Sequence, residues 1–139
     1  NTLPLSSNVG TMKKFLSAVK TLLARNEKIL IYPEQGMWWN YRKPRPTEPG
    51  AYKIAAMNKV PIIPLFITMN DSELIGGDGF PIQEYTIHIL PAIFPKEDAG
   101  VKETCEYLQK ENYRVCKEVY EKVYGIPLVY DGKNYTDVK

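Results

Sequence analysis

The chain has 139 residues, 44% of them hydrophobic and 24% charged, a composition typical of one globular domain with a real core. Its 18 basic and 16 acidic residues give a formal net charge of +2, which argues against a whole-surface field for nucleic acid. No apolar run approaches the roughly 18 residues of a membrane-spanning helix. The composition therefore excludes a mainly disordered chain and predicts a domain that is soluble by itself or peripheral to a membrane.

The first part of the sequence predicts a helix followed by a strand. Residues 6–8, Ser-Ser-Asn, are candidate caps for a helix that runs to about Asn26. An apolar stripe that includes Phe15 recurs at helical spacing along this segment. Residues 29–32 are continuously apolar, which is typical of a strand covered on both faces. We therefore expect a helix that leads into a buried strand.

The middle of the chain alternates further elements. Residues 40–49 are basic and rich in proline, which predicts a loop because proline lacks the ladder donor. A short helix is predicted from position 49 or 50 to 57, with proline favoured in its first turn. Residues 60–69 and 84–94 read as strands, and the glycines of residues 70–80 predict a flexible loop between them.

The last predicted helix starts at Asp98 as a cap and ends at Gly125, and residues 126–139 are predicted to form a partly ordered tail. The domain therefore spans residues 1–125. Helices that alternate with buried strands predict an α/β fold, with a mixed, largely parallel sheet flanked by helices. In such sheets ligands gather at the carboxyl ends of strands.

Cys105 and Cys116 both fall in this last helix. Eleven residues place them on one face but roughly 16 Å apart along the axis, beyond the roughly 7 Å between Cα atoms that a disulfide allows. With one histidine in the chain, a structural zinc site is poorly supported. We expect two reduced thiols, as in an intracellular protein, and no metal.

Several motifs follow one another in a fixed order: Tyr32-Pro33-Glu34, a basic loop, Pro49-Gly50-Ala51 at a short helix, and Val60-Pro61-Ile62-Ile63-Pro64. This order resembles the glycerophosphate and lysophosphatidate acyltransferases over about residues 2–68. In that family, a Phe-Pro-Glu-Gly-Thr-Arg motif at the end of a strand holds the glycerol phosphate acceptor, and a Val-Pro-Ile-x-Pro strand follows later. The resemblance implies a glycerolphosphate-acyltransferase-like fold, incomplete at its amino end.

The resemblance also implies a site. Glu34, Gln35 and Gly36 would shape the acceptor pocket, although Gly36 also suits a plain turn with positive φ. The basic residues Arg42, Lys43 and Arg45 are candidates for the headgroup charge, because arginine can bind phosphate oxygens in bidentate contacts. The amino end of the helix at Gly50 would add backbone N–H groups. The predicted acyl pocket consists of Trp38, Val60, Pro61 and Ile62.

The chain departs from the family pattern at three places. Met37 stands where the family motif has arginine, and serines replace an expected cation near Ser6. The His-x4-Asp motif, in which histidine takes the proton of the acceptor hydroxyl, is absent. His88, the one histidine, lies in an alternating strand pattern and reads as a structural side chain. We therefore expect the carboxyl-side part of an acyltransferase, with no catalytic residue of its own and no acyl transfer by itself.

The implied activity of the parent protein is transfer of a fatty acyl group in phospholipid synthesis. The donor would be acyl-CoA or acyl carrier protein, and the acceptor a hydroxyl of glycerol phosphate or a lysophospholipid. No bound cofactor and no nucleic acid partner are expected. The family implies peripheral association with the membrane, at its cytoplasmic face.

Three alternatives stay open from the sequence. Residues 43–49 fit a polyproline ligand for an SH3-like module. Trp38, Trp39 and Tyr41, interleaved with basic residues, are able to stack on single-stranded nucleic acid. The chain also fits a non-catalytic relative of the acyltransferases that only binds lipid.

Overall fold

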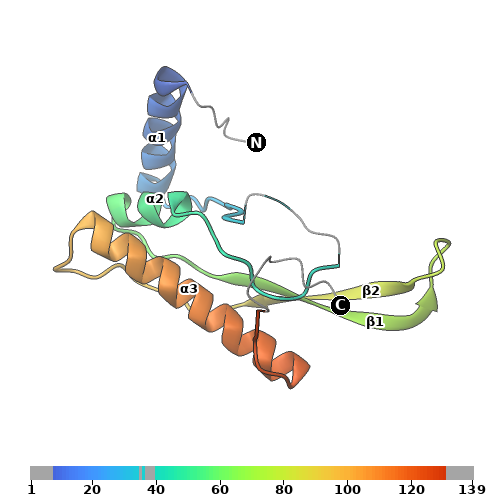
Figure 1. Cartoon of the computed structure of the whole chain (residues 1–139). Coiled ribbons are helices and arrows are strands. Elements are labelled where there is room, and N and C mark those ends of the chain that lie inside the picture. Colours follow the sequence, from blue (N-terminus) through green and yellow to red (C-terminus); the bar gives the residue numbers. More distant parts are fainter. Residues whose placement is uncertain (1–7, 35, 37–39, 131–139) are drawn as a thin grey trace.

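The computed structural model describes residues 8–34, 36 and 40–130. Its elements, in chain order, are α1 (Val9–Ala24), α2 (Gly50–Asn58), β1 (Leu65–Ile75), β2 (Pro81–Ile89) and α3 (Val101–Tyr124). Helix α2 packs against the first part of α3, and the long β1–β2 hairpin lies beside α3 and extends past it (Figure 1). Helix α1 projects away from this body and contacts it at α2 (Figure 1).

The predicted first helix is confirmed as α1. Asn8 is its N-cap, and the Asn8 side chain accepts hydrogen bonds from the N–H groups of Gly10 at 2.9 Å and Thr11 at 3.2 Å. These bonds satisfy donors that the first helical turn cannot pair internally. Phe15 and Val19, both in the predicted apolar stripe, are the buried residues of the helix.

The core of the molecule is built along α3 from two clusters of buried residues. One joins Tyr52, Ala55 and Ala56 of α2 to Cys105 and Leu108 of α3. The other joins Phe66 of β1 to Cys116 and Tyr120 of α3. Helix α3 is therefore the element that connects the α2 region to the hairpin.

Both cysteines of α3 are free, as predicted from their spacing. They lie in different clusters of the core. Burial raises the pKa of the Cys116 thiol to about 12 and raises that of Cys105. Both thiols are therefore held in the protonated, unreactive form at neutral pH.

The two strands pair antiparallel, with Leu65 opposite Ile89 and Ile67 opposite Ile87. An isolated antiparallel bridge between Ile62 and Ile93 continues the pairing beyond the strands. The prediction of a largely parallel sheet is thus not supported within the described residues. The reason is the connection between the strands. A short turn joins β1 to β2 and allows only antiparallel pairing, because parallel neighbours need a long crossover connection.

The hairpin has two different faces. Phe66 and Thr68 point toward α3 and are buried. The hydroxyl of Tyr124 on α3 accepts a hydrogen bond from the backbone N–H of Met69 at 2.9 Å and donates one to the carbonyl of Met69 at 3.0 Å. The opposite face carries apolar side chains that are largely exposed: Leu65, Ile67, Ile87 and Ile89.

The expected buried strand at residues 29–32 is not formed. This segment is extended but belongs to no strand, and Leu30 and Tyr32 are 63% and 77% exposed. The apolar run satisfied the side-chain pattern of a strand, but a strand also needs a neighbouring backbone to pair with. No described segment pairs with residues 29–32 in this way.

The predicted loop at residues 70–80 and the last predicted helix are correct in kind, with shifted ends. Residues 70–75, expected in a flexible loop, continue β1, and the turn lies at residues 76–80. The N-cap of α3 is Gly100 rather than Asp98, and the helix ends at Gly125, which has a φ of 67°. Glycine adopts this left-handed conformation without the steric cost that a Cβ brings.

Candidate functional site

The motif that suggested a function lies at the start of a long loop, residues 33–49, called here the 33–49 loop. The backbone N–H of Glu48 donates to the carbonyl of Pro33 at 2.8 Å, so the two ends of the loop are joined. Helix α2 begins immediately afterwards, with Pro49 as N-cap. The Tyr-Pro-Glu motif and the start of α2 are therefore held next to each other.

Three of the predicted acceptor residues meet inside this loop. The Arg45 guanidinium donates through Nη1 to the carbonyl of Gly36, and the same nitrogen lies 3.9 Å from Oε2 of Glu34. The Arg45 side chain is 12% exposed, whereas the Glu34 side chain is 41% exposed. The loop thus presents a largely buried cation and a half-exposed carboxyl at one place.

Gly36 lies beside the Glu34–Arg45 pair, and the space next to its backbone bears on ligand access. A Cβ built on Gly36 would meet no heavy atom of the described residues within 4 Å. The open space beside the Gly36 backbone is compatible with close approach of a ligand.

The Glu34 carboxyl titrates in an environment set by two opposing effects. Partial burial raises its pKa, and the nearby Arg45 charge lowers it by a smaller amount, so that the pKa lies above the usual value of 4.5. A carboxyl whose pKa is raised by folding contributes most to stability below its unfolded pKa. That contribution is lost as the pH rises through the higher pKa of the folded state.

Glu34→Gln removes the titrating carboxyl, so this variant should not lose that stability as the pH rises. We expect Glu34→Gln to be more stable than the parent at pH 7 by less than about 1 kcal/mol, because the half-exposed group is screened by solvent, and equally stable near pH 4. Urea denaturation at both pH values measures this difference. Glu48→Gln, at an exposed acid of the same loop, is the matched control. A variant that is less stable than the parent at pH 7 would contradict the account.

The two other predicted cations contact other partners than Glu34. Arg42 forms an ion pair with Asp71 at 2.6 Å and donates to Oε1 of Gln83 at 3.3 Å, which ties the loop to the β1–β2 hairpin. The Lys43 ammonium lies 5.8 Å from the ring centroid of Tyr130. The structure therefore brings only Arg45 of the three cations to Glu34.

The described residues of the predicted acyl pocket, Val60, Pro61 and Ile62, follow directly after α2. Val60 and Ile62 are partly buried against the α2–α3 cluster, and Pro61 is exposed. Ile62 also exchanges backbone hydrogen bonds with Ile93, at 3.0 and 2.8 Å. Gln35 and Trp38 lie outside the described residues.

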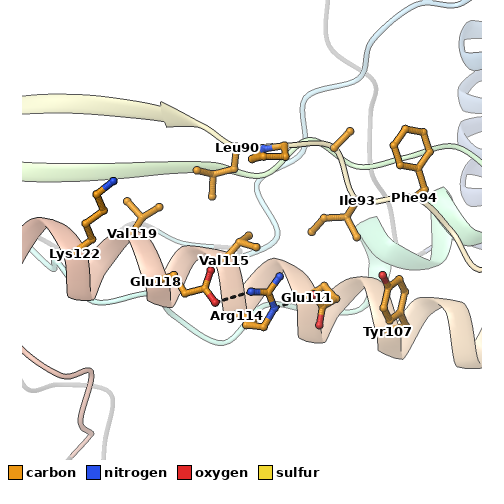
Figure 2. Close-up of a pocket in the computed structure, with 12 residues that line it drawn as sticks. Leu90, Ile93, Phe94, Tyr107, Glu111, Arg114, Val115, Glu118, Val119 and Lys122 are labelled. Atoms are coloured by element: carbon orange, nitrogen blue, oxygen red, sulfur yellow. Dashed lines mark hydrogen bonds and ion pairs between the residues drawn. The ribbon is translucent and has the colours of Figure 1, made fainter.

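A separate groove of about 650 Å³ runs between α3 and residues 90–94 (Figure 2). Its apolar lining includes Leu90, Ile93 and Val119, whereas Arg114 at its rim is held by Glu111 and Glu118 on the same helix. None of the predicted site residues that the structure describes lines this groove.

The polyproline alternative meets a structural obstacle. Pro44 is buried, and its carbonyl accepts a hydrogen bond from the Tyr130 hydroxyl. The Thr47 carbonyl accepts from the amide of Gln109. A polyproline ligand must offer an exposed, extended backbone, and this segment is instead tied to the body of the protein.

Sequence reasoning missed the residues that hold the loop in place. Gln109, Asn112 and Tyr130 lie 60 or more positions after the motif, in a helix and in a segment predicted as a tail. Short-range patterns carry no signal for such long-range hydrogen bonds. Asp71, the partner of Arg42, was likewise placed in a predicted flexible loop.

The described residues hold no group of three or more His, Cys, Asp or Glu side chains arranged for a metal ion. Among the helices that the structure describes, none is long and apolar enough to cross a membrane.

A protein-family model described as Acyltransferase matches residues 2–68. The matched segment contains α1, the 33–49 loop, α2 and the first residues of β1. The match covers 67 of the 139 residues and supports the acyltransferase family for this segment of the chain. No curated protein and no solved structure gives a significant match to the chain.

Proposed function

We propose that this chain supplies the acceptor-binding part of an enzyme that transfers a fatty acyl group to a hydroxyl of glycerol phosphate or a lysophospholipid. The donor would be acyl-CoA or acyl carrier protein. The observation that carries this proposal is the meeting of Glu34 and Arg45 beside Gly36, within the family-matched segment.

The chemistry of the pair suits a polyol phosphate. A guanidinium is always charged and donates to phosphate oxygens in a fixed planar geometry, so Arg45 is the candidate for the phosphate. A carboxylate accepts hydrogen bonds from hydroxyl groups, and Glu34 is half-exposed and thus able to do so. One cation and one acceptor at the same place match the two kinds of group that glycerol phosphate carries.

The role of the site would be orientation of the acceptor. In acyl transfer, the acceptor oxygen attacks the thioester carbonyl, a base takes the hydroxyl proton, and the thiol leaves. Holding the hydroxyl in a fixed place lowers the entropic cost of that encounter. The base would lie outside the 33–49 loop, and peripheral association with the cytoplasmic face of a membrane would bring the lipid substrates to it.

Isothermal titration with three probes tests this function. We expect sn-glycerol 3-phosphate to bind at least about tenfold more tightly than glycerol, because a hydrogen bond to a charged group is worth roughly 1.5–3 kcal/mol. It should also bind more tightly than inorganic phosphate, because the phosphate ion lacks the glycerol hydroxyls from which Glu34 would accept hydrogen bonds. Equal affinity for glycerol phosphate and inorganic phosphate would leave a general anion site only, and no binding of any probe would overturn the proposal.

A further inference from the structure

The carboxyl-terminal helix, outside the family-matched segment, reaches the 33–49 loop through polar side chains. The Gln109 side chain on α3 donates from Nε2 to the Thr47 carbonyl. One turn earlier on α3, the Cys105 thiol lies 3.6 Å from the Pro49 carbonyl. Thr47 is two residues from Arg45, so these bonds constrain the backbone next to the candidate site.

A second set of bonds passes through Tyr52 of α2. The Asn112 amide on α3 donates to the Tyr52 hydroxyl at 3.0 Å, and that hydroxyl donates to the Thr47 hydroxyl at 2.8 Å. Tyr52 is 2% exposed, and burial raises its pKa to about 12. The hydroxyl therefore stays protonated at neutral pH and remains a donor to Thr47.

The segment after α3 holds the other side of the loop. The Tyr130 hydroxyl donates to the carbonyl of Pro44, the residue immediately before Arg45, and the Tyr113 hydroxyl on α3 donates to Tyr130 at 3.3 Å. Arg45 thus lies between two anchored positions, Pro44 and Thr47. The backbone on both sides of Arg45 is therefore held by contacts from the carboxyl-terminal part of the chain.

We propose that Gln109 and Asn112 are positioning residues for the Glu34–Arg45 pair, acting through Thr47 and Tyr52 to fix the backbone around Arg45. The consequence for acceptor binding rests on the proposed function, whereas the consequence for loop geometry does not. Neither residue would touch the acceptor.

Gln109→Glu tests this role directly. The change keeps the shape of the side chain but replaces the donor with a carboxylate that faces the Thr47 carbonyl. Lys110→Gln, on the exposed surface of the same helix, lowers the charge by the same one unit and is the matched control. Asn112→Asp is a second variant, since its carboxylate would accept from the Tyr52 hydroxyl and draw it away from Thr47.

Amide hydrogen exchange at Glu48 reports the loop without any ligand, because this N–H closes the loop onto Pro33. We expect exchange about three- to tenfold faster in Gln109→Glu, as for the loss of one hydrogen bond, while exchange in the middle of α3 is unchanged. The Glu34 carboxyl, followed by NMR, should also titrate closer to its ordinary pKa as the loop loosens. The proposal is overturned if the Glu48 amide exchanges at the same rate in Gln109→Glu and in Asn112→Asp as in the control Lys110→Gln.

Titration with sn-glycerol 3-phosphate then separates this inference from the proposed function. If both are correct, Gln109→Glu binds the probe at least about threefold more weakly than Lys110→Gln does, in line with the exchange result. Faster Glu48 exchange in a chain whose parent never binds the probe would support the positioning role and overturn the proposed function. Binding by the parent, with unchanged affinity and exchange in both variants, would overturn the positioning role alone.

Discussion

Replacing Arg45 with methionine is expected to weaken binding of sn-glycerol 3-phosphate by at least about tenfold, since hydrogen bonds to charged groups contribute roughly 1.5–3 kcal/mol. Arg45 is the one of the three predicted loop cations that the structure places beside Glu34 and Gly36. Its largely buried guanidinium would be weakly screened by salt compared with an exposed cation. Isothermal titration of the variant and the parent measures the loss.

Arg42→Met is the matched control for this prediction. It removes the same charge from the same loop, but Arg42 is paired with Asp71 of the hairpin. We expect Arg42→Met to change the affinity less than threefold, which is a small part of one charged hydrogen bond. Equal losses of affinity in the two variants would show that the loop acts through its total charge, and would contradict a site built on Arg45.

The largest expected effect on stability is at Leu108. Leu108→Ala should lower the free energy of unfolding by about 3 kcal/mol, because truncation of a buried leucine removes apolar contact and leaves a cavity. Leu108 is 0% exposed and lies in the cluster that joins α2 to α3. Chemical denaturation followed by circular dichroism measures the loss.

Leu65→Ala is the matched control, because Leu65 is the same residue type at 48% exposure on the open face of the hairpin. We expect a loss under about 1 kcal/mol there, as for a surface position. A loss at Leu108 no larger than that at Leu65 would mean that the α2–α3 cluster does not form the core described for this chain.

Local sequence signals predicted the elements that depend on local physics. The cap among residues 6–8, which the structure places at Asn8, the apolar stripe around Phe15 and the glycine stop at Gly125 each act within one or two turns of a helix, and each is confirmed. The α/β class was correct in the coarse sense that helices pack on a sheet. The direction of strand pairing was not, because pairing is decided between segments rather than within one.

The same division holds for the candidate site. The motif around Glu34 and the family resemblance predicted a site in the 33–49 loop, and Arg45, which lies beside Glu34, was among the named cations. The sequence did not indicate that Arg42 would instead pair with Asp71, or that Gln109 would hold Thr47 from α3. These contacts join residues 29 and 62 positions apart, and composition and spacing carry no information about such distant partners.

The most direct test of the central claim is an NMR titration of the isotopically labelled chain with sn-glycerol 3-phosphate, read residue by residue. We expect saturable shift changes that are largest at the backbone amides of Gly36 and Arg45 and at the Arg45 side-chain Nε. Shift changes confined to the separate groove at Ile93 and Val119 would contradict an acceptor site in the 33–49 loop. The absence of any shift change, at every concentration at which glycerol also causes none, would contradict it as well.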